Sequence, residues 1–230
     1  MIQANNITKV YHSETVLDIP EITIRQNESF GLVGNNGAGK TTFFRLILDL
    51  IRANSGNITS KSIDVRSTND WKNYTGSYLD QNFLIDFLSP EEYFEFLAEV
   101  HGLSKGDLAE FYAEYDEFFA GEILEKNKYI RDLSNGNKQK VGIASALMFK
   151  PDLVILDEPF NGLDPSTQIR LIKILNKLKT EDGVTLLVSS HDLSHVTEVC
   201  DRIVILEKGK VVTDLATNEN TLKELESYFA

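Results

Sequence analysis

The sequence predicts an α/β fold built on a mostly parallel sheet, with a helical lobe inserted into it. A short apolar segment, 29–33, leads through a glycine-rich loop into a longer apolar stretch at 42–50, in the order strand, loop, helix. Two further apolar runs, 153–157 and 184–190, alternate with segments of helical spacing, as buried parallel strands do. Ahead of these runs, residues 85–145 are rich in Glu, Phe and Tyr and have helical character.

The glycine-rich loop has the sequence of a phosphate site. Glycines let a backbone turn tightly, so that several N–H groups face one concavity, and the next helix adds its positive end. Lys40 can reach terminal phosphates, and Thr41 can offer a hydroxyl to Mg²⁺. The strand before the loop and the helix after it favour this interpretation over an ordinary glycine-rich turn. The pattern G-x-x-x-x-G-K-T comprises Gly34, Asn35, Asn36, Gly37, Ala38, Gly39, Lys40 and Thr41, and Thr42 follows it.

Before the loop, residues 1–30 are spaced as short strands. Tyr11 lies here, just ahead of a predicted turn. It is either an aromatic residue of an edge strand or a platform on which a nucleotide base stacks, since aromatic faces stack on bases. The residue alone does not decide between these two roles.

The helical lobe is predicted from its helix starts. Ser89 is a typical N-cap with Pro90 at the first helical position, and a second helix follows Ser104. The many acidic residues of this lobe predict a solvated face. We expect a single domain, in which the lobe at 85–145 separates a β subdomain with the glycine loop (1–84) from the rest of the α/β core (146–230).

Composition limits the classes of partner. The 230 residues carry a net charge of −12, which argues against sequence-independent nucleic-acid binding and against adsorption to anionic lipid. The only cysteine, Cys200, is predicted to be a buried structural thiol, which suits a reducing compartment. The chain does not begin with a basic start and an apolar run, so we expect no secretory signal. No apolar run approaches the roughly 20 residues of a membrane span, so any membrane contact is expected through a partner.

Two carboxylates end the buried run at 153–157. Asp157 at the end of a strand beside a phosphate loop can hold Mg²⁺, and Glu158 can orient or deprotonate an attacking water. An Asp-Glu pair that only caps the following turn is the alternative, and the upstream phosphate loop favours catalysis. Upstream, residues 76–81 are predicted as a strand with Gln81 at its edge.

With these motifs in order, the chain resembles the ATP-binding subunit of an ABC transporter over essentially its whole length. The glycine loop matches Walker A, and Leu153–Asp157 matches Walker B. Residues 133–140, Leu-Ser-Asn-Gly-Asn-Lys-Gln-Lys, stand where the family has its L-S-G-G-Q signature. Asn135 and Asn137 depart from that signature, whereas Gly136 is kept. The resemblance implies a P-loop NTPase (RecA-like) core, an N-terminal antiparallel β subdomain and an inserted α-helical subdomain.

The resemblance also implies a set of site residues. The implied catalytic residues are Lys40, the Q-loop Gln81, the carboxylate Glu158 and the switch histidine His191. Mg²⁺ is expected on Thr41, Gln81 and Asp157. ATP is expected to contact Tyr11, the glycine-loop residues Gly34, Asn35, Asn36, Gly37, Ala38, Gly39, Lys40, Thr41 and Thr42, and the family positions Ser134, Gly136 and Asp164.

In this family two subunits close head to tail around two ATP molecules, so that Ser134 and Gly136 of one chain face Walker A of the other. Ser134 is also a good helix N-cap, and both roles can hold together. Each half-site looks complete, which favours a homodimer. The resemblance further implies a permease on another chain, a position at the cytoplasmic face of the membrane, and no nucleic acid. The helical lobe resembles that of drug and antibiotic exporters, although importers share every catalytic motif.

Other functions remain open at this point. A soluble ABC ATPase acting on ribosomes or DNA is the main alternative, although such proteins usually carry two cassettes or a long coiled coil. A module that closes on ATP without turnover is disfavoured by Glu158 and His191. A small GTPase is disfavoured because the chain lacks an Asn-Lys-x-Asp motif.

Overall fold

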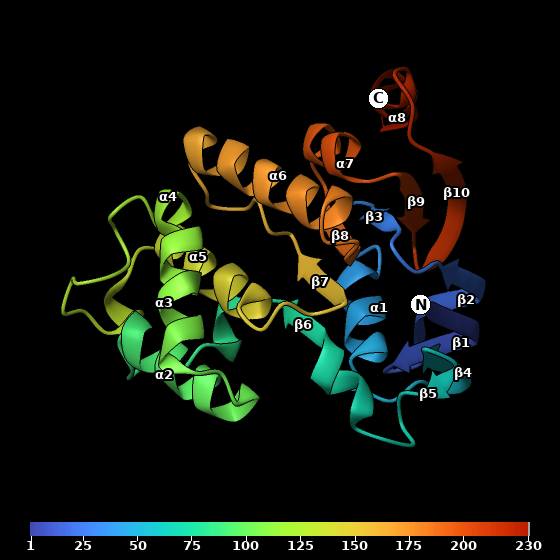
Figure 1. Ribbon diagram of the computed structural model, residues 1–230. Helices are drawn as coiled ribbons and strands as arrows, with labels where there is room; N and C mark the ends of the chain where they lie inside the picture. Colours follow the sequence, from blue (N-terminus) through green and yellow to red (C-terminus); the bar gives the residue numbers. More distant parts are fainter. Residues whose placement is uncertain (230) are drawn as a thin grey trace.

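The computed structural model describes residues 1–229, with side chains through residue 226, as two sheets and the helices around them (Figure 1). The larger sheet has six strands in the order β10-β9-β3-β8-β7-β6. Five of them run parallel, and β10 pairs antiparallel at one edge. The predicted mostly parallel sheet is therefore confirmed. Its strands are β3 (Ser29–Val33), β6 (Thr75–Tyr78), β7 (Leu153–Asp157), β8 (Thr185–Ser190), β9 (Arg202–Glu207) and β10 (Lys210–Ala216).

The smaller sheet is antiparallel and lies beside the first, as the family resemblance implies (Figure 1). Its order is β2-β1-β4-β5, with β1 pairing to both β2 and β4. Side chains such as Ile2 and Ile19 point inward and share a buried cluster with Phe43 and Phe44 of α1 (Lys40–Ile47). This packing fixes the helix that follows the glycine loop. The strands are β1 (Ile2–Tyr11), β2 (Glu14–Ile24), β4 (Ser55–Ser60) and β5 (Ile63–Asp64).

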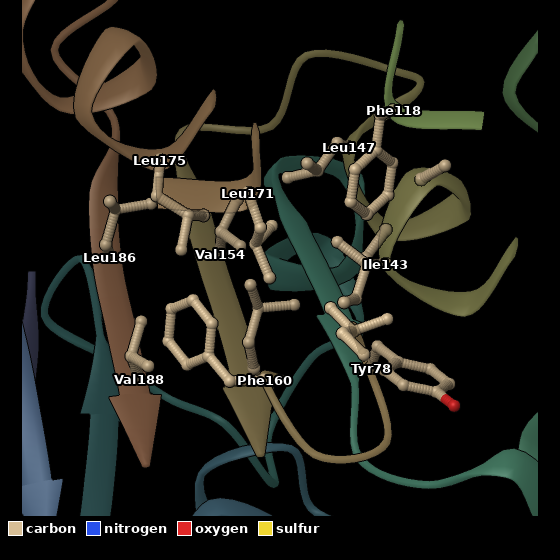
Figure 2. Close-up of a cluster of buried hydrophobic side chains, with 14 of the residues drawn as sticks. Tyr78, Phe118, Ile143, Leu147, Val154, Phe160, Leu171, Leu175, Leu186 and Val188 are labelled. Atoms are coloured by element: carbon tan, nitrogen blue, oxygen red, sulfur yellow. The ribbon is translucent and has the colours of Figure 1, made fainter. Parts of the chain in front are cut away.

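The central strands β7 and β8 are buried along their whole length because helices cover both faces of the sheet. Leu153, Ile155 and Leu187 face the cluster that contains α1. Alternate residues face the other way, and Figure 2 shows Val154 and Leu186 beside Leu171 and Leu175 of a covering helix. The helices of this second face and the C-terminal part are α5 (Asn135–Leu147), α6 (Pro165–Thr180), α7 (Leu193–Val199) and α8 (Thr221–Phe229).

The helical lobe comprises α2 (Pro90–His101), α3 (Lys105–Glu114) and α4 (Asp116–Phe119), which lie on the far side of the molecule from the antiparallel sheet (Figure 1). The predicted N-cap Ser89 is confirmed, and the second helix follows Ser104 as predicted; each serine forms a capping box. The aromatic side chains of the lobe extend the buried cluster on this face of the sheet, and among them Phe94 packs on Phe111 with ring centroids 5.1 Å apart. The residue boundaries of the three subdomains stay a prediction.

Strand register places several predicted site residues at one edge of the sheet. Val33 at the end of β3 pairs with Ser190 of β8, and Asp157 at the end of β7 pairs with Ser189. Because parallel strands end at the same edge, the loops that follow β3, β7 and β8 meet there. The glycine loop, Glu158 and His191 lie on these loops.

The strand predicted over residues 76–81 is wrong at its end. It stops at Tyr78, and Gln81 instead begins a short 3₁₀ turn, η2 (Gln81–Phe83). The carboxylate of Asp80 accepts a hydrogen bond from the Asn82 N–H at 2.7 Å. A side chain that captures a backbone donor in this way favours a turn over a strand.

Cys200 follows α7 and is buried, as predicted. Burial raises the pKa of its thiol to about 12. The thiol therefore stays protonated at neutral pH and serves as a small apolar group in the core.

Candidate functional site

The loop between β3 and α1 forms a concavity at the edge of the sheet. Gly39 is the N-cap of α1 and has a φ of 108°, a backbone conformation that L side chains rarely adopt. A Cβ on Gly34 would lie 2.3 Å from the carbonyl oxygen of Leu206, so only glycine fits there. The middle of the loop, residues 35–38, borders a cavity of about 390 Å³ together with residues 205–208.

The turn between β9 and β10 supports this loop from outside. The Gly209 N–H donates to the Ala38 carbonyl at 2.9 Å, and the Gly209 carbonyl accepts from the Asp18 N–H at 2.7 Å. Gly209 therefore links the backbone of the glycine loop to the backbone of β2.

Lys40 lies across the mouth of the loop. Its ammonium donates to the Gly34 carbonyl at 2.6 Å and lies 3.1 Å from Glu158 Oε1. The side chain is only 6 % exposed, so both partners offset the cost of removing its charge from water. A phosphate that entered the concavity would exchange for these partners.

Thr41 and Asp157 are two of the three ligands that the sequence predicts for Mg²⁺, and they lie in contact with each other, whereas the third, Gln81, bonds to the Asn135 carbonyl. The Thr41 hydroxyl donates to Asp157 Oδ2, and the Ser189 hydroxyl donates to Oδ1 of the same carboxylate. Burial raises the pKa of Asp157, whereas the hydrogen bonds from Ser189 and Thr41 lower it. One carboxylate and one hydroxyl, with phosphate oxygens to complete the shell, are a donor set that suits Mg²⁺. The residues present therefore fit the ion.

Glu158 lies between a cation and a histidine. Its Oε1 is beside Lys40, and its Oε2 is 2.8 Å from Nδ1 of His191. The Glu158 N–H donates to the Ser189 hydroxyl at 2.9 Å. Its φ of 49° is unusual for a residue with a side chain, and such strained backbone clusters at functional sites. The carboxylate is positioned to accept a proton at the edge of the phosphate loop.

The signature segment begins α5. The Ser134 hydroxyl caps the helix by accepting from the Asn137 N–H at 3.2 Å. A Cβ on Gly136 would lie 2.7 Å from the Gly162 carbonyl oxygen, so this helix end packs closely on the loop after β7. Gln81 meets the same helix, because its Nε2 donates to the Asn135 carbonyl at 3.4 Å.

Three other predicted ligands lie apart from this constellation in their described contacts. The Tyr11 ring, at the end of β1, packs under the Lys9 ammonium, 4.7 Å from the ring centroid. The Asp164 carboxylate caps α6 by accepting from the N–H groups of Ser166 and Thr167, and hydrogen bonds from these two residues lower its pKa. Thr42 is half-buried in the first turn of α1. Their nucleotide contacts stay predictions.

Two residues of the site were not predicted. Ser189 binds both Asp157 and the backbone of Glu158, and Gln139 donates to the carbonyls of Glu158 and Pro159. Ser189 could have been singled out in the way that Asp157 was, because it also lies near the end of a buried strand. Gln139 was visible only as a polar residue on a helix with a buried face.

Comparison with known proteins agrees with this geometry. The ABC transporter family matches residues 17–161, more than half of the chain. The chain belongs to the ABC transporter ATP-binding family. An uncharacterized ABC transporter ATP-binding protein of Bacillus subtilis (strain 168), YhaQ, is 35% identical over 100% of this chain and 74% of its own length. The linearmycin resistance ATP-binding protein LnrL of the same strain is 34% identical over 92% of this chain and 68% of its own.

The fold has a solved counterpart among ABC cassettes. A dimeric structure of the ATP-binding cassette MJ0796, in a post-hydrolysis state with ADP and Pi, aligns with a TM-score of 0.84 and 25% identity. The alignment covers 95% of this chain and 99% of that one. The P-loop NTPase core of an ABC ATPase is therefore shown for this chain.

Proposed function

We propose that this ABC family member hydrolyses ATP with Mg²⁺ and that the energy drives a separate membrane permease. The observation that carries the proposal is the meeting of Lys40, Thr41, Asp157, Glu158 and His191 at one edge of the sheet. Lys40 would bind phosphate, and Thr41 and Asp157 would bind Mg²⁺. Glu158 would serve as the base, with His191 as a further polar group beside it. Phosphoryl transfer needs these parts and little covalent chemistry from the protein.

Phosphate binding and activation of the base are linked through Lys40. In the structure its ammonium is shared between Gly34 and Glu158. When the β- and γ-phosphates of ATP take this ammonium, the Glu158 carboxylate loses its cation. The carboxylate is then free of its ion pair and available to accept the proton of the attacking water.

The other side chains hold the reacting groups. Mg²⁺ bound by Thr41 and Asp157 supplies charge neutralisation on the phosphates. Ser189 keeps the Asp157 carboxylate oriented toward that position. His191, in contact with Glu158 Oε2, is placed to orient the attacking water or to donate to the γ-phosphate.

A second copy of this chain is proposed to complete each site. Ser134 and Gly136 lie at the N-terminal end of α5, a helix of 13 residues, where free N–H groups and the helix dipole favour an anion. The γ-phosphate is present in ATP and absent from ADP, so ATP favours the closed head-to-tail dimer and hydrolysis releases it.

A permease is the proposed membrane partner. Among the described residues no helix is long and apolar enough to cross a bilayer. Leu50, Phe83 and Phe87 are exposed apolar side chains, and Leu50 and Phe83 line a cavity of about 290 Å³ close to Gln81. Such a patch suits a cytoplasmic helix of a permease. The resistance named for the relative LnrL supports export as the direction.

Replacing the proposed base tests the function. Glu158→Gln removes the proton acceptor and keeps the shape, so turnover should fall at least about a hundredfold while ATP still assembles the dimer. ATP hydrolysis and light scattering are measured together, with the exposed Glu110→Gln on α3 as the matched control. Hydrolysis by Glu158→Gln at the parent rate would refute the assignment.

Purification from native membranes in detergent tests the partner. Mass spectrometry should identify a multi-span membrane protein that co-purifies with this chain. Recovery only from the soluble fraction, with ribosomal or DNA-associated proteins, would instead favour the non-transport ABC ATPases.

A further inference from the structure

The side chain of Gln139 is a buried connector between three parts of the protein. It is 6 % exposed on α5, and its amide nitrogen donates to the carbonyls of Glu158 at 3.1 Å and Pro159 at 3.2 Å. Its amide oxygen accepts from the Tyr78 hydroxyl at 3.1 Å. Tyr78 ends β6 at the margin of the apolar core, with its hydroxyl directed away from the neighbouring aliphatic side chains (Figure 2).

These bonds hold the peptide that carries the proposed base. The Glu158 N–H is held by Ser189, and the Glu158 carbonyl is held by Gln139, so both ends of the residue are fixed. A residue kept at a φ of 49° needs its surroundings to hold it there. The Pro159 carbonyl accepts from the same amide nitrogen, so Gln139 also holds the next residue of this bend.

We propose that Gln139 is a positioning residue for ATP hydrolysis, which fixes the Glu158 backbone to the helix that begins with the signature segment. The proposal rests on Glu158 as the base. Ser134 and Gly136 open the same helix, and Gly136 packs against the Gly162 carbonyl of the loop after Glu158. The signature helix therefore meets the catalytic loop at two points, one through Gln139 and one through Gly136.

This arrangement gives the partner's nucleotide a path to the base. In the proposed dimer the N-terminal end of α5 binds the γ-phosphate held by the other chain. A shift of that helix moves Gln139, and Gln139 moves the Glu158 peptide. Small displacements matter here, because misplacement by about 1 Å can cost about a hundredfold in rate.

The test is Gln139→Met, which keeps the length of the side chain and removes the amide. We expect kcat for ATP to fall about tenfold or more, with KM for ATP and the ATP-driven dimer close to those of the parent. Tyr78→Phe keeps both amide-to-carbonyl bonds and removes the hydrogen bond that orients the amide, so kcat should fall only about threefold. Gln168→Met is the matched control, because Gln168 donates to the carbonyl of Phe160 from the opposite helix, α6.

A structural role alone would give a different pattern. If kcat stays within about twofold of the parent in Gln139→Met, the proposal is overturned. It is equally overturned if kcat, ATP binding and the unfolding midpoint all decline together, or if Gln168→Met lowers kcat as much. The Glu158→Gln variant separates this proposal from the proposed function. Full activity in that variant refutes the assignment of Glu158 as the base. Loss of activity there, with full activity in Gln139→Met, refutes only the positioning role.

Discussion

Removing the Ser189 hydroxyl tests how the buried carboxylate of Asp157, the proposed Mg²⁺ ligand, is held. The hydroxyl donates to Asp157 Oδ1 and accepts from the Glu158 N–H. In Ser189→Ala the Glu158 N–H keeps a partner, since it also donates to the Ser189 carbonyl at 3.2 Å. The carboxylate of Asp157, only 6 % exposed, keeps Thr41 and loses its second donor. The cost of the substitution is therefore set by Asp157.

The magnitude follows from the charge on that carboxylate. A hydrogen bond to a charged group contributes about 1.5–3 kcal/mol. We take about 2 kcal/mol, which raises the pKa of Asp157 further and weakens Mg²⁺ binding by as much as about 30-fold at a pH where the carboxylate is largely protonated. Burial already raises this pKa. Because Mg²⁺ needs the ionised carboxylate, the defect should grow as the pH falls.

The assay is a Mg²⁺ titration of ATP turnover at neutral and mildly acidic pH, beside urea unfolding of the same samples. Ser190→Ala is the matched control from the same strand, because its hydroxyl accepts only a backbone N–H, that of Asp192 at 2.9 Å. It should cost about 1 kcal/mol in unfolding free energy and leave the Mg²⁺ dependence unchanged. A Ser189→Ala protein with the parent's Mg²⁺ titration at both pH values would refute the reasoning.

Four further predictions concern other residues and the pH dependence of turnover. Lys40→Ala should weaken ATP binding by about 2 kcal/mol, because a charge-assisted phosphate contact is lost, and unchanged affinity in calorimetric titration would contradict this. Ser134→Arg should leave ATP binding to the monomer intact and block the ATP-dependent dimer, so a dimer in light scattering would count against the sandwich. Gly142→Ala should cost about 1–3 kcal/mol in urea unfolding, because its Cβ would lie 2.0 Å from the ring of Tyr78. Mg²⁺-dependent turnover of the parent should fall toward acid at a higher pH than an ordinary aspartate would impose, since burial raises the pKa of Asp157; an acid limb in the ordinary range would contradict this.

The features that the sequence could predict depend on neighbours along the chain. The N-caps at Ser89 and Ser104 bond to residues three positions ahead, so their pattern is local. The glycine loop is likewise a continuous segment whose spacing encodes its backbone shape. Asp157 could be placed at the sheet edge because a parallel strand must end there. Gln81 was wrongly placed at a strand end because the Asp80 carboxylate accepts a hydrogen bond from the Asn82 N–H. This local turn is not recorded in the apolar pattern that predicts strands.

The parts that the sequence could not predict depend on contacts between distant segments. Ser189 lies 32 residues from Asp157, and Gln139 lies 19 residues from Glu158, so neither contact leaves a spacing to recognise. Both residues are polar groups in buried surroundings, where an unpaired donor or acceptor is costly. A buried polar side chain must therefore have a partner, and the sequence does not say which one. Here the partners are the carboxylate of Asp157, the proposed Mg²⁺ ligand, and the peptide of Glu158, the proposed base. The hydrogen bonds that satisfy Ser189 and Gln139 therefore also set the geometry of the proposed reaction.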